Sequence, residues 1–140
     1  MKRIFLSMLL AVVALFCACA KPAANPADEN TVVIVPSEQV LALDGATLAD
    51  YLAAMKERGL ISYTIENGML TEVNGKKNRS TGTSSAECWM IYTSDPDYSN
   101  AAFGTLTYDG VVYPSASLGA ESIVLSKSFV YLLAYHTVTW

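Results

Sequence analysis

The sequence has few of the side chains on which most catalytic sites depend. It contains one histidine, His136, and three cysteines, Cys17, Cys19 and Cys88. After residue 18 there is no G-x-S-x-G, P-loop, Rossmann-glycine, H-E-x-x-H or C-x-x-C pattern. The chain therefore lacks the motifs of the common hydrolases, nucleotide-binding proteins, zinc proteases and disulfide oxidoreductases. We expect no enzymatic activity and no cofactor.

A run of basic residues is also missing. The chain has 9 basic and 13 acidic residues. Without the first 18 residues, which contain Lys2 and Arg3, seven basic residues remain against 13 acidic ones, a net charge of −6. An acidic chain without a basic block argues against nucleic-acid binding and against electrostatic docking on anionic lipid.

No apolar run is long enough for a membrane span, but the N-terminus has the three parts of an export signal. Lys2 and Arg3 precede an apolar run over residues 4–16, which is shorter than the roughly 20 residues of a spanning helix. The segment Phe16-Cys17-Ala18-Cys19 then resembles the lipobox of bacterial lipoproteins. We expect residues 1–18 to be a lipoprotein signal peptide and Cys19 to be lipidated. The alternative is an ordinary secretory signal, cleaved after Ala18 or Ala20 without lipid.

The composition after Cys19 favours lipid attachment. Residues 21–30, KPAANPADEN, are polar and rich in proline, alanine and asparagine, as in flexible linkers. We therefore expect residues 19–30 to tether one domain, residues 31–140, to the outer face of the bacterial cell membrane. With Cys19 lipidated, Cys88 is the only other cysteine, so the domain has no internal disulfide and depends on packing for its stability.

The domain sequence predicts one main helix. It covers residues 47–58, with Thr47 as the N-cap, Asp50 in the first turn and Gly59 just after the end. The helix has one apolar stripe at helical spacing, formed by Leu48, Leu52 and Met55.

Strands are predicted for most of the rest. The turn signals Asn67-Gly68 and Asp109-Gly110 indicate two hairpins, and a second Asn-Gly pair stands at residues 74–75. The predicted strands are residues 31–35, 61–66, 69–73, 87–93, 103–108, 111–113 and 129–140. Residues 76–85 (KKNRSTGTSS) are polar and predict a mobile loop. This order predicts an α+β fold, in which one helix packs on a mixed or antiparallel sheet.

The same order resembles a known family. GATLADYL, ISYTIENGMLTEVNG and CWMIYTSD follow one another as in the bacterial domain related to the C-terminal domain of transcobalamin, a member of the soluble-ligand-binding β-grasp group. The family's helix-opening threonine and leucine correspond to Thr47 and Leu48, and its Tyr/Cys-Trp strand corresponds to Cys88, Trp89 and Tyr92. The resemblance covers roughly residues 32–140. It implies a β-grasp-like domain that captures a ligand, as on surface lipoproteins that feed transporters, with cobalamin the best-known ligand of one relative. The sequence departs from the family after the tryptophan strand, where SDPDYSNAAFGTLTYDG replaces a short Asn-Gly turn.

Aromatic side chains are numerous for a domain of this size. Tyrosine and tryptophan combine a large apolar area with one polar group, which suits flat organic ligands, glycans or protein partners. We expect Tyr98 and Tyr113 to be exposed because they border turns. The candidate ligand contacts are Trp89, Tyr92, Asp95, Asp97, Tyr98 and Tyr113.

Three alternative roles for polar residues remain open. Cys88 and His136 would form a nucleophile–base pair if their strands were adjacent. The same two residues with Met90 would offer soft ligands to copper, zinc or cobalt. A calcium site would use oxygen atoms of Asp95, Asp97 and Asn100. The simpler interpretation, which we favour, is that Cys88 and Met90 pack in the core, that the acids cap a turn and that no metal is bound.

These observations lead to two functional hypotheses. The first is a non-enzymatic cell-surface lipoprotein that captures a small ligand, such as a corrinoid-like molecule or a metal complex, and passes it to an import transporter. The second is a surface interaction or adhesion module that recognises protein or glycan.

Overall fold

The structure is a computed structural model that describes residues 29–38 and 45–140. The predicted signal peptide, Cys19 and nearly all of the predicted tether lie outside the described residues. Within the described ranges, no helix has the length and the apolar character needed to cross a membrane.

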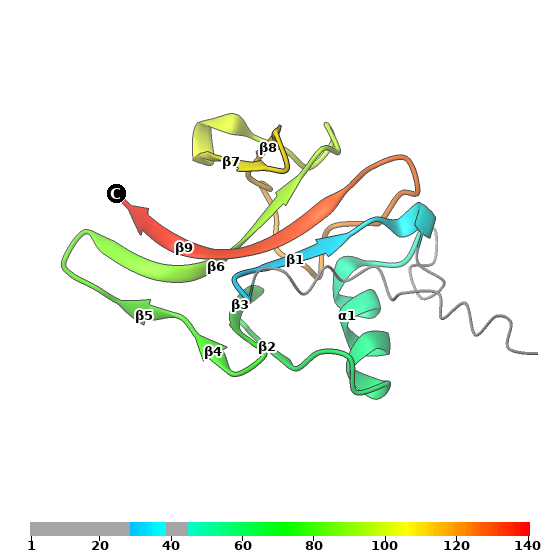
Figure 1. Ribbon diagram of the computed structural model, residues 1–140, viewed down its shortest axis with the longest axis horizontal. Coiled ribbons are helices and arrows are strands. Elements are labelled where there is room, and N and C mark those ends of the chain that lie inside the picture. Colours follow the sequence, from blue (N-terminus) through cyan, green and yellow to red (C-terminus); the bar gives the residue numbers. More distant parts are fainter. Residues whose placement is uncertain (1–28, 39–44) are drawn as a thin grey trace, which may run out of the picture.

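Four strands in the order β1-β9-β6-β5 form the main sheet (Figure 1). They are β1 (Thr31–Ile34), β9 (Tyr131–Thr139), β6 (Ser85–Thr93) and β5 (Arg79–Ser80). β6 and β9 pair antiparallel along all nine residues, from Ser85 opposite Thr139 to Thr93 opposite Tyr131. The other strand pairs of the described chain are also antiparallel.

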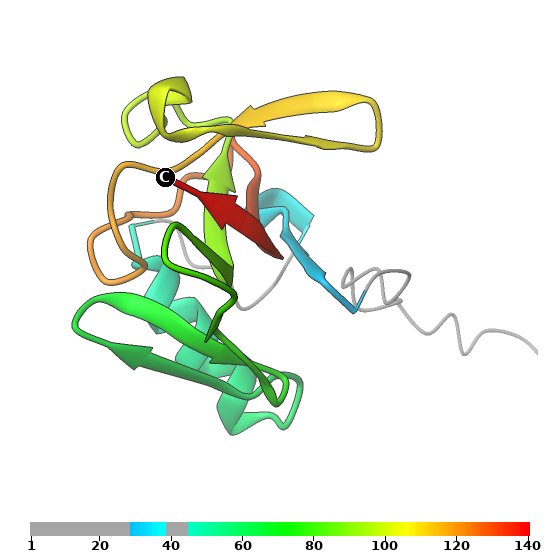
Figure 2. The same cartoon turned by 90° about the vertical axis from the view of Figure 1, so that its left-hand side faces the viewer.

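Each face of this sheet packs on a hydrophobic cluster. Side chains alternate between the faces of a strand, so Trp89 and Ile91 of β6 contribute to one hydrophobic cluster, whereas Met90 and Tyr92 contribute to the other. β9 repeats the alternation: Leu133 lies in the first cluster and Leu132 and Ala134 in the second. The domain therefore has layers on both sides of the sheet, as Figures 1 and 2 show.

On the first face lie the helix and a small sheet. Helix α1 (Leu48–Glu57) begins with a capping box, in which the Asp50 amide donates to the Thr47 hydroxyl at 3.1 Å and the Thr47 amide donates to the Asp50 carboxylate at 2.9 Å. The bond from the Thr47 backbone lowers the pKa of Asp50. The buried stripe of α1 consists of Leu48, Tyr51, Leu52 and Met55. Next to α1, β2 (Tyr63–Glu66), β3 (Met69–Val73) and β4 (Lys76–Lys77) form a three-stranded sheet.

A hairpin covers the second face. It consists of β7 (Thr105–Tyr108) and β8 (Val111–Pro114), joined at Asp109-Gly110, where both residues have positive φ. Leu106, Tyr108 and Tyr113 pack on the second cluster, and the hairpin lies on the opposite side of β6 from α1 and β2–β3 (Figure 2). Two 3-10 turns, Pro36–Glu38 and Ala101–Phe103, complete the regular structure of the described residues.

The connection from residue 115 to residue 130 has no strand or helix, but it belongs to the core. Ala120, Ile123 and Leu125 are buried in the first cluster. The carbonyls of Ile123 and Ala120 accept hydrogen bonds from the amides of Leu48 and Ala49, at 2.8 and 3.0 Å. The loop thus provides partners for amides in the first turn of α1, which have none within the helix.

Most local predictions are confirmed. The α+β class, the bounds and N-cap of the helix, and the hairpins at Asn67-Gly68 and Asp109-Gly110 are as expected. One prediction was wrong: residues 76–85 are not a loop throughout, because they contain β4, β5 and the start of β6. The polar composition of this segment gave no sign of the side-chain hydrogen bonds and the ion pair that attach it to the main sheet.

Candidate ligand-binding site

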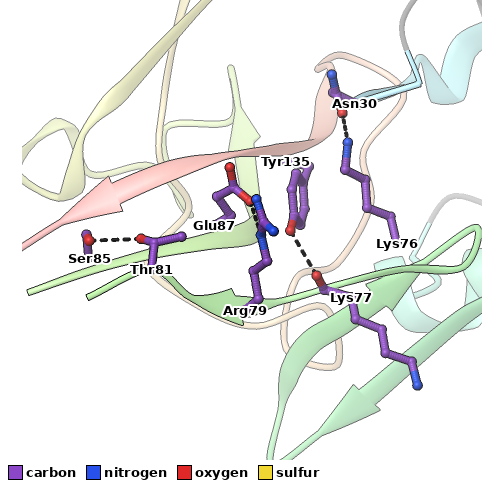
Figure 3. Close-up of polar contacts among 8 residues, drawn as sticks. All are labelled: Asn30, Lys76, Lys77, Arg79, Thr81, Ser85, Glu87 and Tyr135. Carbon is purple, nitrogen blue, oxygen red and sulfur yellow. Dashed lines mark hydrogen bonds and ion pairs between the residues drawn. The ribbon is translucent and has the colours of Figure 1, made fainter. Parts of the chain in front are cut away.

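Two aromatic residues attach the polar segment 76–80 to the main sheet. Trp89 of β6 and Tyr135 of β9 are opposite each other, with ring centroids 5.4 Å apart. Trp89 Nε1 donates to the Lys76 carbonyl at 2.8 Å. The Tyr135 hydroxyl donates to the Lys77 carbonyl at 2.9 Å (Figure 3). The ammonium of Lys76 lies 4.5 Å from the centroid of the Tyr135 ring and donates to Asn30 Oδ1. These contacts hold β4 close to the sheet.

Beyond β4, the segment is fixed by polar pairs. Arg79 of β5 forms an ion pair with Glu87 of β6, its Cα partner in the strand pair (Figure 3). This contact raises the pKa of the guanidinium and lowers the pKa of the carboxyl. The hydroxyls of Thr81 and Ser85 are 2.8 Å apart. Polar pairing thus explains why a segment without apolar residues is ordered into a short strand.

The outer edge of β6 is only partly covered. β5 pairs with β6 at Ala86 and Glu87. Next, the Trp89 amide donates to Asn78 Oδ1 at 2.8 Å, so a side chain takes the place of a strand carbonyl. Further on, the Ile91 carbonyl accepts from the Ala116 amide at 2.7 Å. Outside the strand ladders, no hydrogen bond of the described chain engages the Trp89 carbonyl or the Ile91 amide, which lie between these points.

A cleft of about 360 Å³ opens at this uncovered edge. Residues 89–91 of β6 form one side, residues 67–70 of the β2–β3 hairpin form another, and the loop residues 116–119, Glu121 and Ser122 close it. The volume lies at the low end of the roughly 300–1,000 Å³ typical of small-molecule sites.

The loop and the hairpin meet at two glycines. A Cβ atom added to Gly119 would lie 2.2 Å from the carbonyl oxygen of Gly68, so only glycine permits this close approach. Gly68 itself has φ +80° in the Asn67-Gly68 turn, where glycine is the favoured residue. The wall of the cleft therefore depends on backbone-to-backbone contact.

The cleft combines apolar side chains with unpaired backbone groups. Met69 and Leu118, at its lining, are 63% and 47% exposed, whereas Leu70 and Trp89 are buried. Glu121 is the one ionisable residue among those that line it. Asn67, Ser117 and Ser122 add polar side chains to the lining. The arrangement is suited to hold a neutral ligand with an apolar part and an amide-like polar part.

The structure separates the predicted ligand contacts. Trp89 lines the cleft, but Tyr92 points to the opposite face of β6 and packs in the second cluster. Asp95 is buried and accepts from the Tyr131 hydroxyl at 2.9 Å and from the Asp97 amide at 3.0 Å. Burial also raises the pKa of Tyr131 to about 12. Asp95 thus caps a turn and anchors β9.

The expectation that Tyr98 and Tyr113 are exposed was wrong. Both are half-buried, because Tyr98 packs on the first cluster and Tyr113 on the second. The exposed aromatic residues of the described chain are Phe103 and Trp140.

The two alternative metal sites have no complete ligand set. Asp95 is engaged as described, and Asn100 Oδ1 accepts from the Ala102 amide at 2.9 Å. No group of three or more His, Cys, Asp or Glu side chains in residues 29–38 and 45–140 is placed to hold a metal ion.

Cys88 and His136 are indeed on adjacent strands and directly opposite each other. The His136 ring, however, is hydrogen-bonded through Nε2 to the Tyr92 hydroxyl. Tyr92 reaches His136 across Ala134, whose small side chain leaves room for the ring. Burial raises the pKa of Cys88 and lowers the pKa of His136. An activated thiolate needs the opposite shift of the cysteine pKa.

Comparison with protein-family models, with curated proteins and with solved structures found no match. The resemblance to transcobalamin-related domains therefore stays a prediction from the sequence.

Sequence reasoning missed most of the cleft. Met69 was assigned only to a strand, and Leu118 and Gly119 were assigned to no element. The available signal was local: Asn67-Gly68 fixed the hairpin that forms one wall. Nothing local indicated that the loop around Gly119 would meet it.

We predict that Asn78→Ala will loosen β4 and β5. The substitution removes the acceptor of the Trp89 amide and the donor to the Leu70 carbonyl, which is 2.8 Å from Asn78 Nδ2. Leaving such groups unpaired should cost about 1–3 kcal/mol of unfolding free energy. Chemical denaturation measures this cost, and hydrogen exchange of the Trp89 amide should accelerate. Asn100→Ala is the matched control, and equal Trp89 exchange in both variants would contradict the prediction.

We predict that His136 makes the protein less stable as the solution becomes mildly acidic. Because burial lowers the pKa of His136, the unfolded chain binds the proton at a higher pH than the folded chain does. Stability should therefore be complete above about pH 6.5 and decline as the pH falls from there toward the folded-state pKa. His136 is the only histidine. His136→Gln should flatten the dependence of the unfolding free energy between about pH 7.5 and 5.5, and an unchanged slope would refute this role.

Proposed function

We propose that this chain is a non-enzymatic lipoprotein of the bacterial cell surface that captures a small ligand, and that the cleft at the β6 edge is its binding site. The observation that carries the proposal is the cleft itself: a concave site whose lining combines apolar and polar side chains with the uncovered edge of β6. Small-ligand sites typically combine an apolar lining with a few polar groups that orient the ligand.

The size of the cleft bears on the ligand. At about 360 Å³ it suits a compact molecule, or one group of a larger molecule such as a corrinoid-like compound. A captured ligand would then pass to an import transporter, the partner that the resemblance implies.

The surroundings of Cys88 and His136 support a binding role over a catalytic one. Burial raises the pKa of Cys88 and so disfavours the thiolate that nucleophilic catalysis needs, and Nε2 of His136 is hydrogen-bonded to the Tyr92 hydroxyl. The second hypothesis, an adhesion module, would be favoured by an exposed aromatic patch without a cavity. Here Phe103 lies in the 3-10 turn Ala101–Phe103 and Trp140 follows the end of β9, and a cleft is present.

The binding proposal is tested by a ligand screen with two glycine variants. Corrinoids, metal complexes and small neutral amides are screened by thermal shift and calorimetry against the full-length chain. Gly119→Ala would place a methyl group against the Gly68 carbonyl and displace the wall, so a ligand of the cleft should bind at least about tenfold more weakly. Gly82→Ala, where the added Cβ meets only the Ser85 hydroxyl oxygen at 3.2 Å, should bind like the wild type.

Two outcomes would count against the proposal. One is the absence of any ligand that binds more tightly than about millimolar, a weak limit on the affinity scale. The other is a ligand whose affinity is the same for the wild type and Gly119→Ala, which would place its site elsewhere.

The surface location is tested separately at Cys19. Metabolic labelling with a radioactive fatty acid should mark the wild-type chain and leave Cys19→Ala unlabelled. Equal labelling of Cys19→Ala would overturn the assignment of the anchor. Cys88→Ala is the matched control, and it should be labelled like the wild type.

A further inference from the structure

The cleft contains a gap of one residue in a hydrogen-bonded strand edge. Residues 89 and 91 of β6 direct their backbone groups away from β9, as the bonds of the Trp89 amide to Asn78 and of the Ile91 carbonyl to Ala116 show. The Trp89 carbonyl and the Ile91 amide lie between these two bonded groups, and residues 89–91 line the cleft.

The neighbours of the gap define what would fill it. In an antiparallel ladder each outward-facing residue exchanges two hydrogen bonds with its partner. Asn78 Oδ1 already supplies the carbonyl opposite Trp89, and the Ala116 amide already supplies the donor opposite Ile91. What is missing is one N–H group for the Trp89 carbonyl and one C=O group for the Ile91 amide. In a peptide, these two groups flank a single residue.

We propose that the cleft binds a compact neutral ligand with an acyl-amino-acid amide unit, whose acyl C=O accepts from the Ile91 amide and whose amide N–H donates to the Trp89 carbonyl. This inference rests on the proposed function and names the ligand class of the same site. The ligand completes the edge of β6 as a one-residue strand.

The surroundings determine the rest of the ligand. Asn78 and Ala116 close the edge on both sides of the gap, so a long peptide strand has no path along β6 and a short molecule fits better. The two end groups of the ligand lie opposite Trp89 and Ile91, so they are on the same face of the sheet as these side chains. Leu70 lies on that face, in the same hydrophobic cluster. Both ends of the ligand are therefore apolar. Because like charges repel, Glu121 at the cleft disfavours a ligand with a free carboxylate.

The test uses N-isovaleryl-glycine isobutylamide as the probe and the full-length, ¹⁵N-labelled chain. In an NMR titration, the Ile91 amide should shift most among the cleft residues, and its hydrogen exchange should slow when the probe is bound. The analogue with an N-methylated isobutylamide lacks the donor to the Trp89 carbonyl and should bind about threefold to tenfold more weakly, the loss of one hydrogen bond. The free acid N-isovaleryl-glycine should also bind more weakly.

Two matched variants locate the apolar contacts. Leu118→Ala, in the cleft, should weaken binding of the probe by about fivefold to twentyfold. Leu60→Ala changes a residue of similar exposure, 52% against 47%, outside the cleft lining and should leave the affinity unchanged.

The outcomes separate this inference from the proposed function. If a different ligand class binds and depends on Gly119 but the probe does not bind, the ligand class is wrong and the binding site stands. If the probe binds without protecting the Ile91 amide, or equally well as its N-methylated analogue, the edge-completion geometry is overturned. If neither the probe nor any compound of the screen binds, both proposals fail.

Discussion

The pairing of β6 with β9 is the constraint on which the rest of the structure depends. Nine consecutive residue pairs fix the register, and the two faces of the strand pair pack in different clusters. A shift by one residue would move every side chain of a strand to the opposite face. Trp89 would then leave the face on which Lys76 and Tyr135 lie, and Tyr92 would lose its hydrogen bond to His136. The contacts that hold the layers on both faces of the sheet thus depend on the register of one strand pair.

The same register determines where the cleft lies. It directs the backbone groups of residues 89 and 91 away from β9, toward an edge that β5 is too short to cover. An exposed strand edge is usually protected by charge, a bulge or a covering loop. Here the side chain of Asn78 and the backbone of Ala116 cover the two sides and leave the middle uncovered. The candidate site is therefore a consequence of incomplete edge protection.

How far the sequence predicted this arrangement depends on the range of each interaction. The N-cap at Thr47, the Asn67-Gly68 turn and the strand that contains Trp89 are local signals, and each was correctly predicted. The burial of Ile123 and the contact of Gly119 with Gly68 join segments far apart in the chain, and no periodicity precedes them. Trp89 was selected because it is aromatic, but its position at the cleft depends on Asn78, which polarity had assigned to a mobile loop.

The position of the proposed anchor is compatible with an accessible cleft. The chain enters the main sheet through β1, one edge strand, whereas β5 and the uncovered part of β6 lie on the other side of β9. An anchor at Cys19 would join the domain upstream of β1, so lipid attachment and the proposed binding at the cleft would use different edges of the sheet. A ligand bound at β6 would add hydrogen bonds beside the register that orders both layers. Because such a ligand binds only the folded domain, occupancy of the cleft should also stabilise the fold.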